Sequence, residues 1–342
     1  MVETPRTTAA MHQSRRRVVA MARRQSLNSI DSLEPHVNCS KCPRPAATFL
    51  RYSGQHLCTE HFLEFTERRA KKELRRQLDL DRTHRIAIAL SGGKDSSTAT
   101  FLLSRILGGK RGLELVAITV DEGIAGYRPG GIESAKRLCK KLGVEHHVVS
   151  YEDLFGWTMD RVAVTDPETI ACSYCGVFRR YALNKEARGL RADYVATGLN
   201  LDDTAQSVLM NVARGDMERM ARLGPHTKAK EDMIPRLQPL RVIPEKETYL
   251  YAMLQGLVFH DATCPYSDRA MRGLFRDVLN RLETSIPGTR HSMLSSLDQM
   301  RPWLNGELSG VRVGKCKKCG EPTVNATCKA CELVQKLDAM VT

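Results

Sequence analysis

The middle of the chain alternates between short apolar runs and amphipathic segments. Four runs rich in β-forming residues cover residues 85–90, 113–120, 146–151 and 192–197. Apolar residues with helical spacing follow at 97–107, 132–142, 178–188 and 203–214. Because single helices between consecutive strands make right-handed crossovers, this pattern predicts an α/β fold: a doubly wound, mostly parallel sheet with helices on both faces.

The flanking regions differ in character from this α/β region. Residues 1–35 are rich in Arg and Ser and show no periodicity, which predicts a basic, disordered tail. A basic arm that folds onto a polyanion and an organelle-targeting leader are the alternatives for this tail. A strongly charged stretch at 64–80 predicts a helix, and residues 267–305 are predicted to be wholly helical. The last 30 or so residues are predicted to form a small Cys-rich unit.

Composition narrows the class of protein. The 342 residues are 42% hydrophobic and 27% charged, which is enough for a substantial core. No stretch approaches the ~18 consecutive apolar residues of a membrane-spanning helix, and no secretory signal is recognisable. Lys and Arg outnumber Asp and Glu by 52 to 39, a net charge of +13. This surplus favours a polyanionic partner, and without an apolar anchor nucleic acid is favoured over membrane.

Cysteine is the most informative residue type in the chain. Eleven cysteines without an export signal favour metal ligands or reactive thiols in a reducing compartment, so we expect a cytoplasmic protein. Two groups have the spacing of tetrahedral zinc sites, with paired ligands on tight turns. These are Cys39, Cys42, Cys58 and His61 near the start, and Cys316, Cys319, Cys328 and Cys331 near the end. Both are expected to be closed, structural sites that hold basic loops against RNA.

Three further cysteines do not form a complete four-ligand set. Cys172 and Cys175 are separated by two residues, and their partner Cys264 lies far along the chain. Three thiolates suit a cluster or metal with one open position. A redox dithiol and a zinc site completed by a nearby His are equally compatible with this spacing. Cys139 lies in a helical apolar pattern and is expected to be buried.

A glycine-rich loop is expected between the first strand of the sheet and its helix. Glycines let the backbone N–H groups turn inward, and the helix start adds the positive end of a dipole. Hydroxyl groups and one lysine complete a loop that suits phosphate oxygens. The spacing fits neither the P-loop nor the dinucleotide-binding motif. The loop comprises Ser91, Gly92, Gly93, Lys94, Asp95 and Ser96.

The sequence SGGKDS after a first strand resembles the pyrophosphate loop (PP-loop) of N-type ATP pyrophosphatases. The resemblance implies that the six loop residues cradle the phosphates of ATP with Mg²⁺. It also implies that Ala89 lies against the nucleoside and that Val120 or its neighbours flank the adenine. Asp121 and Glu122 follow the second strand, where parallel sheets bind ligands, but they are equally suited to capping the next turn.

The order of all these motifs resembles the TtcA/TtuA family of tRNA thiolation enzymes, most closely the group of TtuA and the wobble-uridine thiolases. The similarity runs from about Cys39 to Cys331. It implies that Cys172, Cys175 and Cys264 hold a 4Fe–4S cluster with one iron free for sulfide. A ubiquitin-like thiocarboxylate carrier as sulfur donor and a homodimer are further family expectations.

The same resemblance extends to the segment TGLNLDDTAQ. It implies that Gly198 allows close approach to ATP and that Asp203 is a catalytic carboxylate, acting with Lys94 and the three thiols. Asn200 and Asp202 are candidates for the helix cap, and Asp202 is preferred. Arg179 matches a basic position expected to contact phosphate, although an isolated Arg on a helix is usually solvated. Many family members have His where this chain has Leu199.

The implied reaction replaces the 2-oxo group of a tRNA uridine by sulfur: ATP adenylates O2, sulfide adds at C2, and AMP leaves. The same reaction through a persulfide on Cys175 or Cys264 is the first alternative. Another adenylating synthetase, of the amidotransferase or lysidine synthetase type, leaves the three thiols unexplained, and a non-enzymatic RNA-binding protein leaves SGGKDS unexplained.

The expected domains are a tail at 1–35, a zinc unit with linker helix at 36–80, a PP-loop domain at 81–265, a helical RNA-binding extension at 266–308 and a zinc ribbon at 309–342.

Overall fold

The computed structural model describes residues 37–79, 82, 84–226, 233–267, 271–308 and 313–341. The predicted tail at 1–35 lies outside these residues. The chain divides into two compact units, residues 1–62 and residues 63–342. Within the parts described, no helix is both long and apolar enough to cross a membrane.

The first unit is a small hairpin with the start of a helix. It contains β1 (Thr48–Leu50) and β2 (Gln55–Leu57), which pair antiparallel, and the first residues of α2 (Thr59–Gln77). The charged stretch predicted to be helical at 64–80 lies within and just beyond α2, which begins five residues earlier than expected.

The second unit is organised around a five-stranded sheet in the order β5-β4-β3-β6-β7, and every pair in it is parallel. The four predicted strands are confirmed, each within two residues at either end. The fifth strand was not predicted, because two residues carry no recognisable pattern. The strands are β3 (His84–Ala89), β4 (Leu113–Asp121), β5 (Glu145–Ser150), β6 (Tyr194–Thr197) and β7 (Arg236–Leu237).

Alternate residues of the strands face two different layers of helices. On one face, Val116, Ile118 and Val195 join a core with α5, α6 and α7. On the other face, Ile86, Ile88 and Ala196 pack against side chains of α2 and α3, and Ala117 packs against α4. The predicted doubly wound α/β fold is therefore confirmed. The helices that cover the sheet are α3 (Lys94–Leu107), α4 (Arg128–Leu142), α5 (Tyr151–Phe155), α6 (Met159–Thr165) and α7 (Ala171–Gly189).

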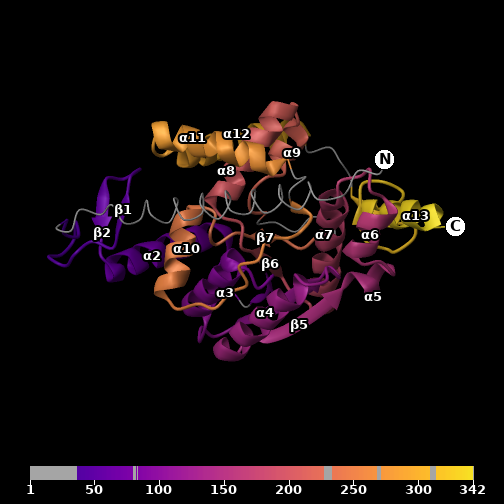
Figure 1. Cartoon of the computed structure of the whole chain (residues 1–342), viewed down its shortest axis with the longest axis horizontal. Coiled ribbons are helices and arrows are strands. Elements are labelled where there is room, and N and C mark those ends of the chain that lie inside the picture. The colour runs from indigo at the N-terminus through magenta and orange to yellow at the C-terminus, as the bar shows by residue number, and fades with distance from the viewer. Residues whose placement is uncertain are drawn as a thin grey trace, which may run out of the picture. The chain divides into compact units, whose positions relative to one another are not determined.

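The chain after β6 adds further helices to this domain. α11 and α12 pack against α8 and α9 (Figure 1). The stretch 267–305 is not wholly helical as predicted, because the chain breaks at Ile286–Gly288, where Pro287 cannot donate a helical hydrogen bond and Gly288 has φ +97°. The helices are α8 (Leu201–Arg214), α9 (Met217–Ala221), α10 (Glu245–Leu254), α11 (Arg272–Ser285) and α12 (Thr289–Leu308).

The chain ends with a short hairpin and a helix. β8 (Gly314–Lys315) pairs antiparallel with β9 (Pro322–Thr323), and α13 (Lys329–Val341) follows. The side chains of Cys316, Cys328 and Leu337 belong to the same core as α7 and the sheet. This terminal segment is therefore built into the second unit.

Candidate functional site

The sheet reverses its strand order between β3 and β6, and this switch point carries the glycine loop. β4 and β5 extend from one side of β3, whereas β6 and β7 extend from the other. In parallel sheets, ligands bind in the crevice at the carboxyl ends of the strands at such a point. Ala89 ends β3, and buried Val120 lies near the end of β4, so both candidate nucleoside contacts lie at this edge.

The glycine loop is a tight turn whose shape depends on glycine. Gly92 has φ +79°, and a β-carbon there would lie 1.9 Å from the carbonyl oxygen of Gly131 in α4. The Ser96 hydroxyl lies 2.9 Å from the Ser91 hydroxyl, accepts a hydrogen bond from the Ser91 N–H at 3.1 Å and donates to the Gly93 carbonyl at 3.0 Å. The loop therefore leads directly into the N-terminus of α3, as a phosphate-binding loop requires.

Charged side chains surround the start of α3. The Lys94 ammonium lies 2.9 Å from one Asp95 carboxylate oxygen and 3.2 Å from a Glu245 oxygen. Burial lowers the pKa of Lys94, but these two carboxylates more than compensate and leave it above its ordinary value. Lys94 is thus a fixed positive charge beside the loop.

The turn after β6 lies directly against the loop. A β-carbon on Gly198 would be 2.7 Å from the Ser96 backbone nitrogen, so only glycine permits this approach. The Asn200 side-chain amide donates to an Asp95 carboxylate oxygen at 3.2 Å. The two segments that were expected to share one ligand are therefore adjacent.

Asp203 occupies a more constrained position than the sequence indicates. The cap of α8 is Asn200, which forms a capping box with Asp203, so the preferred assignment of Asp202 as the cap is wrong. Asp202 instead accepts a hydrogen bond from the Glu245 N–H at 2.7 Å and pairs with Arg290 at 2.6 Å. Asp202 is already the second residue of α8, and its carboxylate is occupied by these two donors.

Asp203 also forms an ion pair with the first residue of α11. Its carboxylate lies 2.7 Å from the Arg272 guanidinium, which contacts Ser207 at 3.2 Å as well. Burial raises the pKa of Asp203, and Arg272 offsets only part of this rise. No sequence pattern indicates this pair, because 69 residues separate its members.

The three central cysteines come from two segments that meet at one end of α7. Cys172 and Cys175 lie in the first two turns of α7, and Cys264 follows α10. The Cys172 thiol donates to the carbonyl of Tyr266 at 3.5 Å. Burial raises the pKa of all three thiols, and the charge of a neighbouring thiol of the trio raises each pKa further. The structure therefore brings the three thiols together. They are not among the sets of ligand atoms that converge within 4.8 Å, so they do not form a single-ion site.

Two connections join the thiol segments to the glycine loop. The His260 N–H, four residues before Cys264, donates to the Gly92 carbonyl at 2.8 Å. On the α7 side, Arg179 lies 3.2 Å from the Cys175 sulfur and 2.9 Å from the buried Glu122. Glu122 also pairs with Arg128, which donates to the Ser91 carbonyl of the loop at 2.9 Å. Arg179 is thus paired within the protein, and its contact with phosphate remains a prediction. Asp121 caps the following turn by accepting from the Gly123 N–H at 2.9 Å.

Two terminal groups have the compact geometry of single-metal sites. In each group the four ligand atoms lie within 4.8 Å of one another. Measured pairs are Cys39 to His61 at 3.3 Å, Cys42 to Cys58 at 3.8 Å and Cys319 to Cys328 at 3.6 Å. Bonds of ~2.3 Å in a tetrahedron place sulfur atoms ~3.8 Å apart, so both groups fit one tetrahedral ion.

The C-terminal group is anchored to the helix that carries two of the central thiols. Lys336 of α13 lies 2.6 Å from Asp166 and 3.2 Å from Thr169, which precede α7. The Trp157 indole donates to Asp338 at 2.9 Å, and Arg188 of α7 pairs with Glu321. The sequence predicted a separate ribbon and did not indicate these individual polar contacts.

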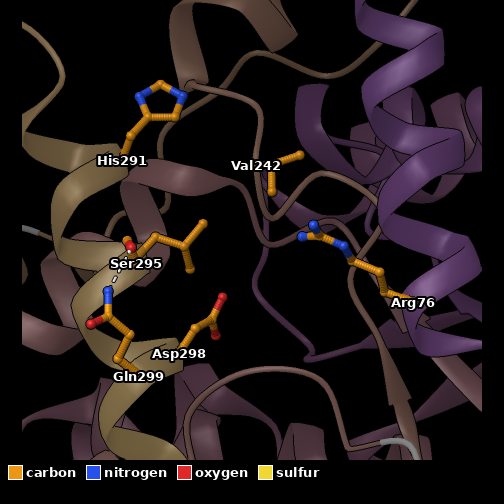
Figure 2. Close-up of a pocket in the computed structure, with 7 residues that line it drawn as sticks. Arg76, Val242, His291, Ser295, Asp298 and Gln299 are labelled. Carbon is orange, nitrogen blue, oxygen red and sulfur yellow. Dashed lines mark hydrogen bonds between the residues drawn. The ribbon is translucent and has the colours of Figure 1, made fainter.

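A pocket of about 350 Å³ lies away from these groups, between α2 and α12 (Figure 2). Gln299 donates to Ser295 at 3.1 Å, and Asp298 pairs with the buried guanidinium of Arg241. Burial and neighbouring Arg69 lower the pKa of His291 to about 4, so this histidine is neutral at physiological pH. None of the predicted site residues line this pocket.

Comparisons with known proteins identify the family of this chain. A PP-loop domain family matches residues 63–283, and the N-terminal LIM domain of the 2-thiouridine synthetase TtuA matches residues 38–63. The tRNA 2-thiolation protein NcsA of Haloferax volcanii is 39% identical over 321 residues, which cover 89% of this chain and 100% of that protein. The chain belongs to the NcsA/TtuA family of tRNA 2-thiolation proteins.

Two other members of the NcsA/TtuA family extend the comparison. Cytoplasmic tRNA 2-thiolation protein 1 of Drosophila melanogaster is 37% identical over 307 residues, 89% of each chain. The solved structure of the U34-tRNA thiolase NcsA from Methanococcus maripaludis, which carries a [4Fe-4S] cluster, is 34% identical with a TM-score of 0.76. The match covers 88% of this chain and 96% of that one. The resemblance inferred from motif order is therefore confirmed.

Proposed function

We propose that this NcsA/TtuA-type chain catalyses ATP-dependent 2-thiolation of a tRNA uridine. The observation that carries the proposal is the connection between the thiols and the glycine loop, through His260 on one side and Arg179 on the other. An adenylating enzyme that transfers sulfur needs these two groups at one site. The similar proteins named tRNA 2-thiolation proteins support the same substrate.

The glycine loop and Lys94 bind the phosphates of ATP in this proposal. Backbone N–H groups at the start of α3 and the Lys94 charge stabilise negative charge as the uridine O2 attacks the α-phosphorus and pyrophosphate leaves. Adenylation turns a poor leaving oxygen into AMP, which departs when sulfide adds at C2. The target base leaves its stack to reach the site.

Mg²⁺ fits the carboxylates of Asp95 and Asp203. Each of these acids is paired with a cation of the protein, Asp95 with Lys94 and Asp203 with Arg272. Carboxylate oxygens are the hard donors that Mg²⁺ prefers. Magnesium would neutralise phosphate charge, and Gly198 would leave room for the nucleotide beside the loop.

Cys172, Cys175 and Cys264 fit a 4Fe–4S cluster better than a single ion, because the three sulfur atoms are not within the short distances of a one-metal site. When bound, such a cluster supplies an iron without a protein ligand as a place for sulfide. Arg179 holds its positive charge beside Cys175. The two terminal four-ligand groups fit structural Zn²⁺.

Several assignments from sequence complete the proposal. Residues 81–265 form the PP-loop domain, 36–80 and 309–342 carry the two zinc units, and 266–308 form a helical extension that contacts tRNA. A ubiquitin-like carrier with a C-terminal thiocarboxylate donates sulfur, and the enzyme works as a homodimer in the cytoplasm. Light scattering of the purified protein measures the dimer directly.

A pair of cysteine variants tests the proposed role of the thiols. Cys264→Ala should lose stoichiometric iron and tRNA 2-thiouridine formation, measured by mass spectrometry after anaerobic purification. Cys139→Ala, which changes a cysteine buried beside the sheet in α4, is the matched control and should retain both. A colourless, iron-free and fully active wild-type enzyme would favour the persulfide alternative. Amine incorporation by an active Cys264→Ala variant would overturn the proposed function.

A further inference from the structure

Glu122 is a buried acid with two positively charged partners. It follows β4 and is 3% exposed. Its carboxylate lies 2.8 Å from the Arg128 guanidinium and 2.9 Å from the Arg179 guanidinium. Its own carbonyl accepts a hydrogen bond from the Met159 N–H at 2.8 Å, so its backbone is fixed as well. A single carboxylate thus holds two arginines from different helices.

The two arginines reach different parts of the site. Arg128, 4% exposed in the first turn of α4, donates to the Ser91 carbonyl of the glycine loop at 2.9 Å. Arg179, in α7, lies 3.2 Å from the sulfur of Cys175. A continuous chain of polar contacts therefore runs from the glycine loop through Glu122 to the thiols.

We propose that Glu122 is a positioning residue that couples the nucleotide loop to the thiol site. This inference rests on the proposed function, since it assigns the two ends to ATP and to sulfur transfer. Glu122 is not among the groups given direct contact with either ligand; it acts by fixing Arg128 against Ser91 and Arg179 against Cys175.

The physical argument depends on burial. A buried charge pair is costly to break, because the remaining partner keeps its desolvation penalty without compensation. Replacing the Glu122 carboxylate by a neutral amide leaves the guanidinium of Arg128 almost fully buried without its counter-charge. Arg128 then moves or recruits another acceptor, and both movements disturb the Ser91 turn. The same substitution removes the anchor that orients Arg179.

Glu122→Gln tests this coupling in the full-length protein, reconstituted anaerobically with iron, sulfide and zinc. Calorimetry with a non-hydrolysable ATP analogue measures nucleotide affinity, and electron paramagnetic resonance of the reduced protein reports the thiol site. We expect about tenfold weaker nucleotide binding, the effect of losing one contact to a charged group, together with a changed spectrum. Glu133→Gln, which removes an exposed pair with Arg137 on α4, is the matched control and should change neither.

Variants of the two arginines test separately the two ends of this series of polar contacts, the glycine loop and the thiols. Arg128→Gln should weaken nucleotide binding and leave the spectrum unchanged, whereas Arg179→Gln should change the spectrum more than nucleotide affinity. In Glu122→Gln/Arg128→Gln, the loss of nucleotide affinity should be smaller than the sum of the single losses, because both substitutions remove the same ion pair. If Glu122→Gln does not fold, Glu122→Asp keeps the charge with a shorter reach, and we expect the same two changes at smaller size.

Two results would overturn the inference while leaving the proposed function intact. One is a Glu122→Gln enzyme with unchanged affinity and spectrum whose melting temperature alone falls. The other is a pair of additive losses in the double variant. If the wild-type protein fails to thiolate tRNA but Glu122→Gln still shifts both measurements, the proposed function fails and the coupling stands.

Discussion

The two terminal four-ligand groups have the same local design but different surroundings. Each places one Cys-x2-Cys pair in a turn closed by antiparallel pairing, the Asn38–Pro45 bridge in one case and β8 with β9 in the other. The second ligand pair lies at the start of a helix, α2 or α13. The first group belongs to a compact unit of its own that ends at Phe62. Two ligands of the second group, Cys316 and Cys328, are buried in the main core beside α7.

The difference shows that ligand spacing defines a metal site but not its structural role. A metal in the first group supports a short segment that has little core of its own. A metal in the second group also fixes α13 against the helix that carries Cys172 and Cys175. The second site is therefore structurally linked to the thiols, and we expect its loss to affect them.

Removing one ligand from each group in turn should have very different effects on the stability of the second unit, and this is the largest effect that we expect. Cys328→Ala should abolish metal binding at the C-terminal group and destabilise the whole second unit, since structural zinc contributes ~10 kcal/mol or more. Cys58→Ala should lose one metal but leave the main calorimetric transition unchanged. Differential scanning calorimetry and metal analysis measure both effects. Equal effects of the two variants on the main transition would contradict the comparison.

A smaller effect is expected at the ion pair that fastens α13. The Lys336 ammonium and the Tyr174 hydroxyl, together with Thr169, hold the pKa of Asp166 well below its usual range. A carboxyl group with a depressed pKa stabilises the fold above its unfolded pKa, about 3.9, and this contribution is lost as the pH falls further. Asp166→Asn should cost about 1.5–3 kcal/mol at pH 7.

The pH dependence distinguishes this pair from ordinary packing. The difference in unfolding free energy between wild type and Asp166→Asn should be constant above pH 5 and should shrink below pH 4. Urea denaturation at a series of pH values provides the measurement. A difference that persists unchanged at pH 3 would show that the charge of Asp166 does not contribute.

The smallest effect is expected at the far end of α13. Asp338→Asn weakens the acceptor for the Trp157 indole and should cost about 1 kcal/mol. Glu332→Gln, which removes an exposed pair with Lys329 on the same helix, is the matched control and should cost at most about 0.5 kcal/mol. Urea titration at neutral pH compares the two, and a larger loss in Glu332→Gln would contradict the assigned contact.

Much of the fold could be predicted because its signals are local. Strand runs, helical spacing and SGGKDS each depend on neighbouring residues, and the cysteine spacing defines both terminal groups. The sequence also indicates that α13 packs against another part of the protein. Its apolar residues have the spacing of one helix face: Ala330, Leu333, Val334 and Leu337. A helix predicted there would have required a partner surface, and α7 provides it.

The remaining features depend on contacts between distant parts of the chain. The pairs of Glu122 with Arg179 and of Asp203 with Arg272 join residues 57 and 69 positions apart. An isolated Glu or Arg in a sequence is usually solvated, so neither pair has a pattern to detect. The assignment of Asp202 as cap failed for a related reason, because its actual donors, Arg290 and the Glu245 backbone, lie outside the local segment.

The approach of Gly92 to Gly131 has a consequence for how the nucleotide motif is defined. A single methyl group on Gly131 would press on the Ser91 carbonyl at 2.8 Å, and one on Gly130 would collide with the His260 ring at 2.5 Å. The sequence SGGKDS alone therefore does not determine the shape of the turn. A second glycine pair, 38 positions downstream of the first, leaves the space that the turn occupies. The same six residues, placed in another sheet without the equivalents of Gly130 and Gly131, would have the same sequence but not the same backbone conformation.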